Sequence, residues 1–214
     1  MEMNGTGVLE IKKILVATTN KGKFKEISSM LSSCPYRIVS LSEMNIDVDV
    51  PETGHTLEEN AYIKARAYSL LSGMVTLADD SGLEVDALDG QPGPLSARYA
   101  GVNVTDAERN EFLLKKMHNV PELKRTARFR CVMVLAWNTA LYETYIGECF
   151  GRINQQPVGN NGFGYDSVFF LPKLAKTMAV LALDEKNLIS HRSVALQKVA
   201  KRLTAETVSA STSI

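Results

Sequence analysis

The amino-acid sequence predicts an α/β protein in which helices flank a mixed β-sheet within a single domain. Strand-like and helix-like segments alternate over the first third of the 214 residues, which is typical of parallel strands joined by helices. Later, two long runs rich in β-forming residues, Arg128–Trp137 and Leu141–Ile153, are separated by the turn-like Asn138-Thr139 and predict an antiparallel hairpin. A sheet with both kinds of pairing is mixed. Hydrophobic residues make up 45% of the chain, enough for a sizeable core.

A strand, a polar loop and a helix open the domain. The apolar run Ile14–Ala17 is expected to be a buried strand. After the loop TTNKGK, a helix is predicted by apolar residues at helical spacing: Phe24, Ile27 and Leu31. Between Ile46 and Val50, apolar residues alternate with acids, a spacing typical of strands, and Pro51 then breaks the pattern.

A second helix and a second strand follow. Thr56 and Glu59 match a capping box, the signature of a helix start. The residues after Thr56 form one apolar helical face: Leu57, Ala61, Ala65, Tyr68 and Leu71. The next strand is expected to end in the acids of LADDSGLEVDALDG, residues 77–90.

The second half of the chain contributes two helices and a glycine-rich turn. Thr105 and Glu108 form another possible capping box, which predicts a helix to about His118. The segment NNGFGYDSVFF reads as a turn that runs into a short aromatic strand, and Ser190–Leu203 reads as an amphipathic helix. We expect residues 1–10 to be a flexible extension, residues 11–204 to form the domain, and residues 205–214 to be a frayed tail.

The composition limits the possible partners. The 24 basic and 24 acidic residues give no net charge, so nothing attracts the whole protein to nucleic acid or to an anionic membrane. An anionic ligand would have to be held by a local cluster. The N-terminus lacks the apolar run of a signal peptide, and three cysteines without metal-type spacing are typical of reduced thiols. A cytoplasmic protein is expected.

The loop TTNKGK lies where α/β proteins often bind anions. It follows a strand and precedes a helix, whose N-terminus offers free N–H groups and a partial positive charge. The loop does not match the Walker A pattern. A plain helix cap is the alternative interpretation.

Acids close to the second strand could hold a metal ion. Asp79 and Asp80, together with Glu52 in the preceding polar loop, supply the hard oxygen ligands that Mg²⁺ prefers. The alternative is that one acid caps a turn while the other pairs with an arginine. The later acids of the segment, Glu84, Asp86 and Asp89, are expected to be solvated or to form a turn.

Two further segments fit a nucleotide. Gly162–Asp166 places Phe163 between glycines, which suits stacking on a flat base, although a simple hairpin turn would look similar. His191 and Arg192 open the last helix, where two potentially cationic side chains oppose the helix dipole and indicate an anion nearby. Together these groups are the ones that an enzyme needs to hydrolyse a nucleoside triphosphate.

The motifs also occur in a known order. From about Ile14 to Leu203, the sequence resembles the inosine/xanthosine triphosphate pyrophosphatase family, also called Ham1-like. The segments that carry the resemblance are VATTNKGKFKEI, Glu52-Thr53-Gly54, Glu59-Asn60-Ala61, ADDSGLEVDAL, GQPGPLSARYAG, GFGYD and EKNLISHRS.

The resemblance implies an activity and an assembly. The family consists of homodimeric, Mg²⁺-dependent enzymes that cleave deaminated purine triphosphates (ITP, dITP and XTP) to the monophosphate and pyrophosphate, which keeps miscoding nucleotides out of DNA and RNA. Its fold has two lobes around a deep nucleotide-binding cleft.

The resemblance also assigns site residues. The triphosphate loop falls on Thr18, Thr19, Asn20, Lys21, Gly22 and Lys23, and Lys64 lies near the phosphates. The metal ligands correspond to Glu52, Asp79 and Asp80. Asp80 also corresponds to the general base, and Ser81 lies next to the nucleotide. Contacts to base and sugar fall on Phe163, Gly164, Tyr165 and Asp166, and the later basic contacts on Lys186, His191 and Arg192.

Two positions depart from the family pattern. Asn160 and Asn161 stand within the usual Gly-Thr-Gly-Gly, and Ser167 replaces the usual Pro. Because asparagine tolerates positive φ, we expect the turn to form. These substitutions bear on base preference rather than on the reaction.

Selectivity and alternative functions complete the expectations. His191 and Arg192 are candidate donors to the 6-oxo group, which adenine lacks; a site built around that acceptor leaves a donor unpaired when adenine enters. A Maf-like nucleotide pyrophosphatase would share the architecture but act on other nucleotides. A nucleotide sensor would bind without releasing pyrophosphate, and the intact acids argue against it.

Overall fold

The computed structural model describes residues 2–3, 9–10 and 12–211. The strands are β1 (Glu2–Met3), β2 (Leu9–Glu10), β3 (Lys13–Val16), β4 (Arg37–Ser40), β5 (Val75–Val85), β6 (Thr126–Ala136), β7 (Tyr142–Ile153), β8 (Phe169–Leu171) and β9 (Lys176–Thr177). The α-helices are α1 (Lys21–Met30), α2 (Leu57–Ser72), α3 (Asp106–Lys116), α4 (Leu183–Ile189) and α5 (His191–Ser211). Short 3₁₀ helices are η1 (Asp86–Leu88), η2 (Gly93–Arg98), η3 (Glu122–Lys124) and η4 (Met178–Val180).

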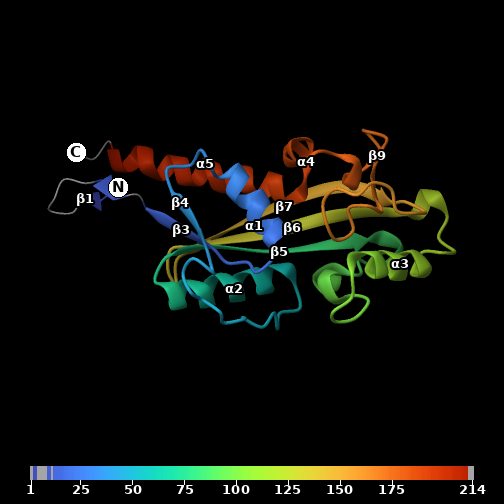
Figure 1. The fold of residues 1–214 in the computed structure, drawn as a ribbon, viewed down its shortest axis with the longest axis horizontal. Helices are drawn as coiled ribbons and strands as arrows, with labels where there is room; N and C mark the ends of the chain where they lie inside the picture. The colour runs from blue at the N-terminus through green and yellow to red at the C-terminus, as the bar shows by residue number, and fades with distance from the viewer. Residues whose placement is uncertain (1, 4–8, 11, 212–214) are drawn as a thin grey trace.

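A seven-stranded mixed sheet forms the centre of the molecule (Figure 1). Its strand order is β4-β3-β5-β6-β7-β8-β9. β3 runs parallel to β4 and β5, and the remaining neighbours pair antiparallel. The prediction of a single α/β domain with a mixed sheet is therefore confirmed. The division into two lobes stays a prediction.

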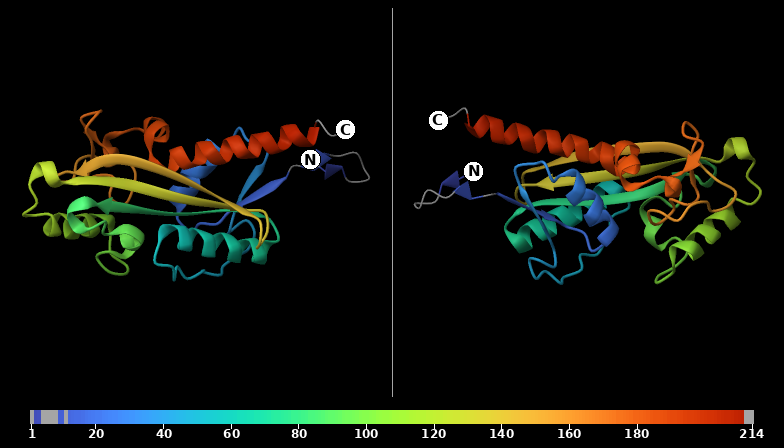
Figure 2. Two further views of the ribbon diagram at one scale, coloured as in Figure 1. Left: turned by 180° about the vertical axis from the view of Figure 1, so that it is seen from behind. Right: turned by 45° about the horizontal axis from the view of Figure 1, so that its top comes forward.

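Helices cover both faces of the sheet. Figures 1 and 2 show α1 and α5 on one face and α2 on the opposite face, with β5, β6 and β7 running the length of the molecule between them. Apolar residues of α1 and α5 form one core with β3, β5 and β6, and apolar residues of α2 form a second core. A third core joins α3 to the far ends of the long strands and to β8. Three hydrophobic cores thus fix the helices against one sheet.

Local sequence signals account for the helix ends. The Thr56 hydroxyl accepts a hydrogen bond from the Glu59 N–H, and α2 ends at Gly73 with a φ of 65°. At α3, Thr105 and Glu108 form the complete capping box. The predicted helices that these caps open are confirmed.

Several elements differ from the expectations. β5 does not end at the acids but continues through them to Val85. The alternating residues 46–50 form no strand; the strand of that region lies earlier, at β4. The helix α4 was not predicted, and α5 extends to Ser211, beyond the expected end near Leu203. Apolar periodicity did not reveal these features because β4 and α4 are short and the end of α5 is polar.

No helix within residues 2–3, 9–10 and 12–211 is long and apolar enough to cross a bilayer. The three cysteines, Cys34, Cys131 and Cys149, are buried free thiols.

Gly147 on β7 allows α5 to approach the sheet closely. A Cβ atom at this position would lie 2.1 Å from the His191 carbonyl oxygen and 2.5 Å from the Ala195 nitrogen, both backbone atoms of α5. Backbone atoms cannot turn aside as a side chain can. The first turn of α5, which carries His191 and Arg192, therefore depends on a glycine in the facing strand.

Replacing Gly147 with alanine should destabilise the protein. We expect Gly147→Ala to lower the free energy of unfolding by about 3 kcal/mol, at the upper end of overpacking effects, because the helix backbone must shift. Urea denaturation measures the change. Thr144→Ala, an exposed site on the same strand, is the control and should stay within about 0.5 kcal/mol of the original chain. Equal stabilities of Gly147→Ala and the original chain would contradict the prediction.

Candidate active site

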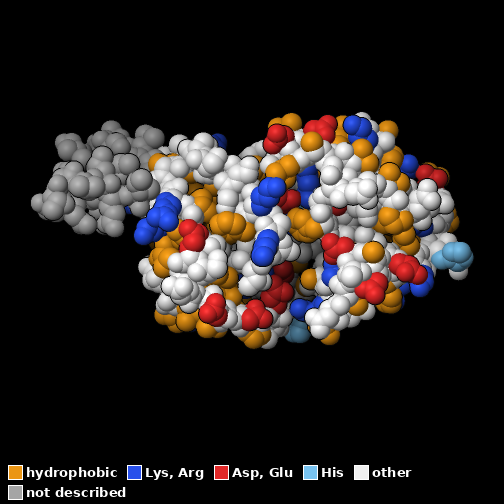
Figure 3. Space-filling model, in the orientation of Figure 1, with side chains coloured by type: hydrophobic (Ala, Val, Ile, Leu, Met, Phe, Trp, Pro, Cys, Tyr) orange, Lys and Arg blue, Asp and Glu red, His pale blue; other side chains and the backbone are white. Residues whose placement is uncertain are grey.

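The strand β5 has one open edge, and a cavity lies along it. β3 pairs with β5 only as far as Leu77, and within the described residues no strand pairs with that edge between Ala78 and Leu83. A cavity of about 760 Å³ is lined there by Asp80, Ser81 and Gly82 of β5 and by segments from both halves of the chain. Figure 3 shows the surface hollowed near its centre, with acidic and basic side chains side by side.

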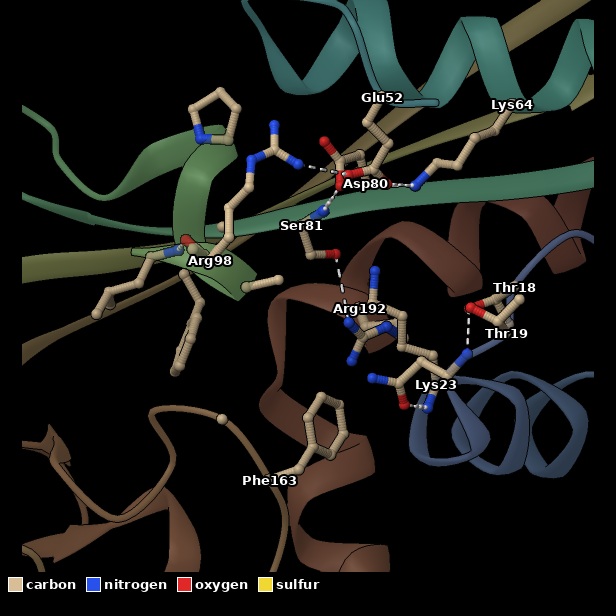
Figure 4. Close-up of a pocket in the computed structure, with 18 of the residues that line it drawn as sticks. Thr18, Thr19, Lys23, Glu52, Lys64, Asp80, Ser81, Arg98, Phe163 and Arg192 are labelled. Carbon is tan, nitrogen blue, oxygen red and sulfur yellow. Dashed lines mark hydrogen bonds and ion pairs between the residues drawn. The ribbon is translucent and has the colours of Figure 1, made fainter. Parts of the chain in front are cut away.

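Two acids and a lysine meet on one side of this edge. The Lys64 ammonium group on α2 lies 2.5 Å from Glu52 Oε1 and 3.6 Å from Asp80 Oδ1. The Arg98 guanidinium group lies 3.7 Å from the other oxygen of Glu52. Figure 4 shows Glu52, Asp80 and Lys64 pointing toward one another. The structure thus brings together three of the predicted site residues.

Burial changes the ionisation of this group. Burial raises the pKa of Asp80; the neighbouring carboxylates Glu52 and Asp79 act in the same direction, while Lys64 opposes them. Burial disfavours the charged form of Lys64, but the carboxylates outweigh burial and raise the pKa of its ammonium group. Asp80 Oδ2 is buried and has no hydrogen-bond partner within the described part of the chain. Asp80 is therefore a carboxylate with one oxygen available.

The loop that carries Glu52 is fastened to α2. The Gly54 N–H donates to Asn60 Oδ1 at 2.8 Å. A Cβ atom at Gly54 would lie 2.5 Å from the Glu59 Cβ atom, so only glycine fits there. This contact explains the spacing between Glu52-Thr53-Gly54 and Glu59-Asn60: the loop and the helix start hold Glu52 against Lys64.

Asp79 lies on the opposite face of the strand, because successive side chains in a strand alternate. It is fully buried, 3.0 Å from the Lys23 ammonium group and 3.5 Å from Arg192 Nε, and the Ser81 hydroxyl donates to it at 2.9 Å. Burial opposes its ionisation, but Lys23 and Arg192 outweigh burial and hold the pKa of Asp79 well below its usual range. The structure does not bring Asp79 together with Glu52.

The predicted triphosphate loop is the N-terminus of α1. The Asn20 side chain accepts a hydrogen bond from the Lys23 N–H at 3.0 Å, and Thr18 Oγ1 accepts from the Asn20 N–H at 3.2 Å. Four of the six loop residues line the cavity: Thr18, Thr19, Asn20 and Lys23. Lys21 is exposed outside it, and Gly22 lies against the Phe163 ring, which would be 3.0 Å from a Cβ atom there.

The turn after β7 carries Phe163 into the cavity. The Phe163 ring lies 4.7 Å from the Lys186 ammonium group and 5.6 Å from the Arg192 guanidinium carbon, measured to the ring centroid. Asp166 accepts from the Phe163 N–H at 3.0 Å and from Lys186 at 2.7 Å. The Tyr165 hydroxyl donates to the Ser96 carbonyl oxygen at 3.0 Å, and its ring is buried. Tyr165 and Asp166 therefore hold this turn in place.

In this turn, the residues with positive φ are glycines and not the asparagines. Positive φ values fall on Gly159, Gly162 and Gly164, at 85°, 78° and 64°. Asn161 instead fastens the turn to the segment before α4: its N–H donates to the Ala179 carbonyl oxygen and its amide group to the Leu181 carbonyl oxygen. The turn forms as expected, but tolerance of asparagine for positive φ is not the reason.

Glu26 on α1 joins the basic residues of the site. Its two oxygens lie 2.8 Å from the Lys186 ammonium group and 2.5 Å from Arg192 NH1. Both cations are buried with it. Burial opposes the ionisation of Glu26, but Arg192 and Lys186 outweigh burial and lower its pKa. Glu26 was not predicted, although it follows Lys23 by three positions and so shares its helix face.

The two potentially cationic side chains at the start of α5 differ, because the surroundings of His191 favour its neutral form. Its ring is buried and stacks on Phe129, with 4.8 Å between the ring centroids. Burial, with Arg192 and Lys186 nearby, lowers the pKa of His191 well below its ordinary value. Nδ1 is buried and has no hydrogen-bond partner in the described structure. His191 can still offer a neutral ring N–H or an acceptor to a ligand.

The donor set fits a divalent cation at Glu52 and Asp80. Both are hard oxygen ligands on one side of the cavity, and the free Oδ2 of Asp80 is an orphaned buried acceptor. Within the described residues, no three His, Cys, Asp or Glu side chains gather as a complete protein site would require. Such a cation would therefore need ligands besides the protein, as Mg²⁺ bound to phosphates has.

Other charged residues line the cavity without having been indicated by the sequence patterns, among them Arg98, Asp106 and Arg109. Arg98 belongs to GQPGPLSARYAG, a segment that carries the family resemblance but whose residues have no role assigned by it. Asp106 and Arg109 lie in the first turn of α3, where acids and arginines are ordinary surface residues. Only the tertiary fold brings them to the site.

Comparison with known proteins agrees with this geometry. The sequence profile of the Ham1 family matches residues 14–202. A protein of Desulforamulus reducens named dITP/XTP pyrophosphatase is 46% identical over 186 residues, covering 87% of this chain and 92% of its own length. A protein of Listeria monocytogenes with the same name is 45% identical over 193 residues, covering 90% and 95%.

Solved structures show the same fold. The Ham1 protein of Staphylococcus aureus superposes with a TM-score of 0.82 at 41% identity, covering 91% of this chain and 100% of its own. A HAM1 protein of Coxiella burnetii gives 0.84 at 39% identity, covering 91% and 99%. With a matching family profile, close relatives over most of the chain and the same fold, this chain belongs to the Ham1 family.

Proposed function

We propose that this protein hydrolyses deaminated purine nucleoside triphosphates, dITP, ITP and XTP, to the monophosphate and pyrophosphate, and so removes miscoding purines from the nucleotide pool. The observation that carries the proposal is one cavity along the open edge of β5 that is lined by the N-terminus of α1, by Lys23 and Lys64, and by Phe163. The names of the relatives at 45–46% identity support it.

The proposed substrate spans this cavity. Its triphosphate lies against the N-terminus of α1, where free N–H groups, Lys23 and the partial charge of the helix favour an anion. Its base stacks on the Phe163 ring. The sugar then lies beside β5, near Ser81.

Glu52 and Asp80 would hold a Mg²⁺ ion together with the substrate phosphates. When bound, the ion supplies positive charge that polarises phosphoryl oxygens. Because Asp79 is neutralised by Lys23 and Arg192 on the other face of β5, we assign it the role of holding those two cations in place rather than of ligating the metal.

Asp80 is the proposed general base. Its free Oδ2 orients a water molecule and takes the proton as the water oxygen attacks the α-phosphorus. The bond between the α-phosphorus and the bridging oxygen breaks, and pyrophosphate leaves with the electron pair. Lys23 and Lys64 offset its charge. Lys186 is paired with Glu26 and Asp166, so it supports the Phe163 turn.

Selectivity for a 6-oxo purine fits the donors at the base end. Arg192 and His191 are the proposed donors to that oxygen, and adenine, which carries an amine there, would offer them no acceptor. A homodimer, which the family resemblance implies, and a cytoplasmic location, which the reduced cysteines indicate, are part of the same proposal.

Asp80→Asn should abolish most of the activity without unfolding the protein. Asparagine keeps the shape and the acceptor for the Ser81 N–H, but it removes the base, which is expected to lower kcat for dITP by about 10²- to 10⁴-fold. Pyrophosphate release measures the loss. Asp86→Asn, whose carboxylate accepts from Thr126 outside the cavity, is the control. Near-normal hydrolysis by Asp80→Asn would remove Asp80 from this role.

Removal of divalent cations should stop hydrolysis. Treatment with EDTA is expected to bring pyrophosphate release to background, and excess Mg²⁺ should restore it. Glu52→Gln should raise the Mg²⁺ concentration needed for half-maximal rate by about 10-fold, because one anionic ligand is lost. A chelated enzyme that hydrolyses dITP at the untreated rate would refute the metal requirement.

A further inference from the structure

The peptide groups on both sides of Gly164 are held by a single helix. The Gly164 N–H donates to Asp106 Oδ2 at 2.6 Å, and the Gly164 carbonyl oxygen accepts from the Asn110 side chain at 3.1 Å. Asp106 and Asn110 lie one turn apart on α3, so both face the same side. Gly164 directly follows Phe163. The backbone next to the proposed base-stacking ring is thus clamped by side chains that no motif indicated.

Two further contacts brace the clamp. Arg109 NH1 donates to the other oxygen of Asp106 at 2.6 Å, and its NH2 donates to the Val104 carbonyl oxygen. The Asn110 amide also donates to the Ser167 hydroxyl at 3.0 Å. Ser167 stands where the family pattern has proline, whose ring offers no such acceptor. The clamp therefore grips the turn at two positions, before and after Tyr165 and Asp166.

The helix that carries the clamp is fixed in the core. Leu113 of α3 and Met117, which directly follows the helix, are fully buried. The capping box of Thr105 closes its N-terminus, and the buried Arg125 guanidinium group donates to the Met117 and Val120 carbonyl oxygens at its other end. A helix held at both ends can fix the position of a flexible glycine turn.

We propose that Asp106 and Asn110 are positioning residues that hold the Gly164 backbone so that the Phe163 ring is already oriented for the nucleobase. Glycine at φ 64° has many alternative conformations, and ordering it only on binding would cost affinity. The clamp's hydrogen bonds to the turn are made beside Phe163, whereas the proposed phosphate contacts come from the N-terminus of α1 and from Lys64. This inference rests on the proposed function, because it assigns the base end of that same site.

A comparison of ligands with and without a base tests the clamp. Asn110→Ala is expected to raise KM for dITP by about 5- to 10-fold, with kcat within about 2-fold, because two hydrogen bonds to the turn are lost. The dissociation constant of dIMP, measured by calorimetry, should rise by a similar factor. The dissociation constant of inorganic tripolyphosphate, which has no base, should change by less than about 2-fold.

Matched variants separate positioning from general damage. Glu111→Ala, on the exposed face of α3 where Glu111 pairs with Lys115, should behave as the original chain. Asp106→Ala should resemble Asn110→Ala, whereas Asp106→Asn, which keeps an acceptor for the Gly164 N–H, should restore most of the dIMP affinity. If Asn110→Ala does not fold, Ser167→Ala removes one of the two Asn110 contacts and should raise KM by about 2- to 3-fold.

The outcomes distinguish the clamp from the proposed function. Equal losses of affinity for tripolyphosphate and dIMP, or no change in either, would overturn the clamp. Failure of the original chain to hydrolyse dITP would overturn the proposed function, and the two dissociation constants would still decide the clamp. A loss confined to dIMP and dITP supports it.

Discussion

The neutralisation of buried carboxylates is the constraint on which the site depends. Asp79 is buried in the middle of the sheet, and an unpaired charge there would destabilise the fold by roughly several kcal/mol. Its partners must come from elements on the same face, α1 and α5. These cations need partners of their own, so charges of opposite sign alternate from β5 to the aromatic turn. The series is Lys23, Asp79, Arg192, Glu26, Lys186 and Asp166.

The open edge of β5 places this series of charges beside the cavity. A strand sends successive side chains to opposite faces, so Asp79 and Asp80 would normally serve separate cores. Where β3 ends and β5 continues, the cavity reaches around the unpaired edge and is lined from both faces. Asp79 fixes the cations on one side, and Asp80 keeps a free oxygen on the other. Two neighbouring acids thus serve different purposes at one site.

Much of this arrangement could be predicted from the sequence, for physical reasons that also mark the limit. Apolar spacing and capping pairs identify α1, α2, α3 and the β6–β7 hairpin because these signals are local. The opposed directions of Asp79 and Asp80 were missed because the strand was expected to stop at the acids. Glu26 looks like a solvated helix residue until the fold brings Arg192 beside it. The neutrality of His191 depends on burial, which no local pattern records.

The pairing of Glu26 with Arg192 also bears on how the protein is made. The two residues are 166 positions apart, and the other buried cation beside Glu26, Lys186, also comes from the last part of the chain. During synthesis the first helix and most of the sheet emerge long before α5, so the early chain must keep Glu26 and Lys23 in water. A partly synthesised chain therefore has no finished nucleotide site. Ligand can bind only once α5 has docked, which makes the docking of α5, rather than formation of the sheet, the step at which the protein gains its binding capacity.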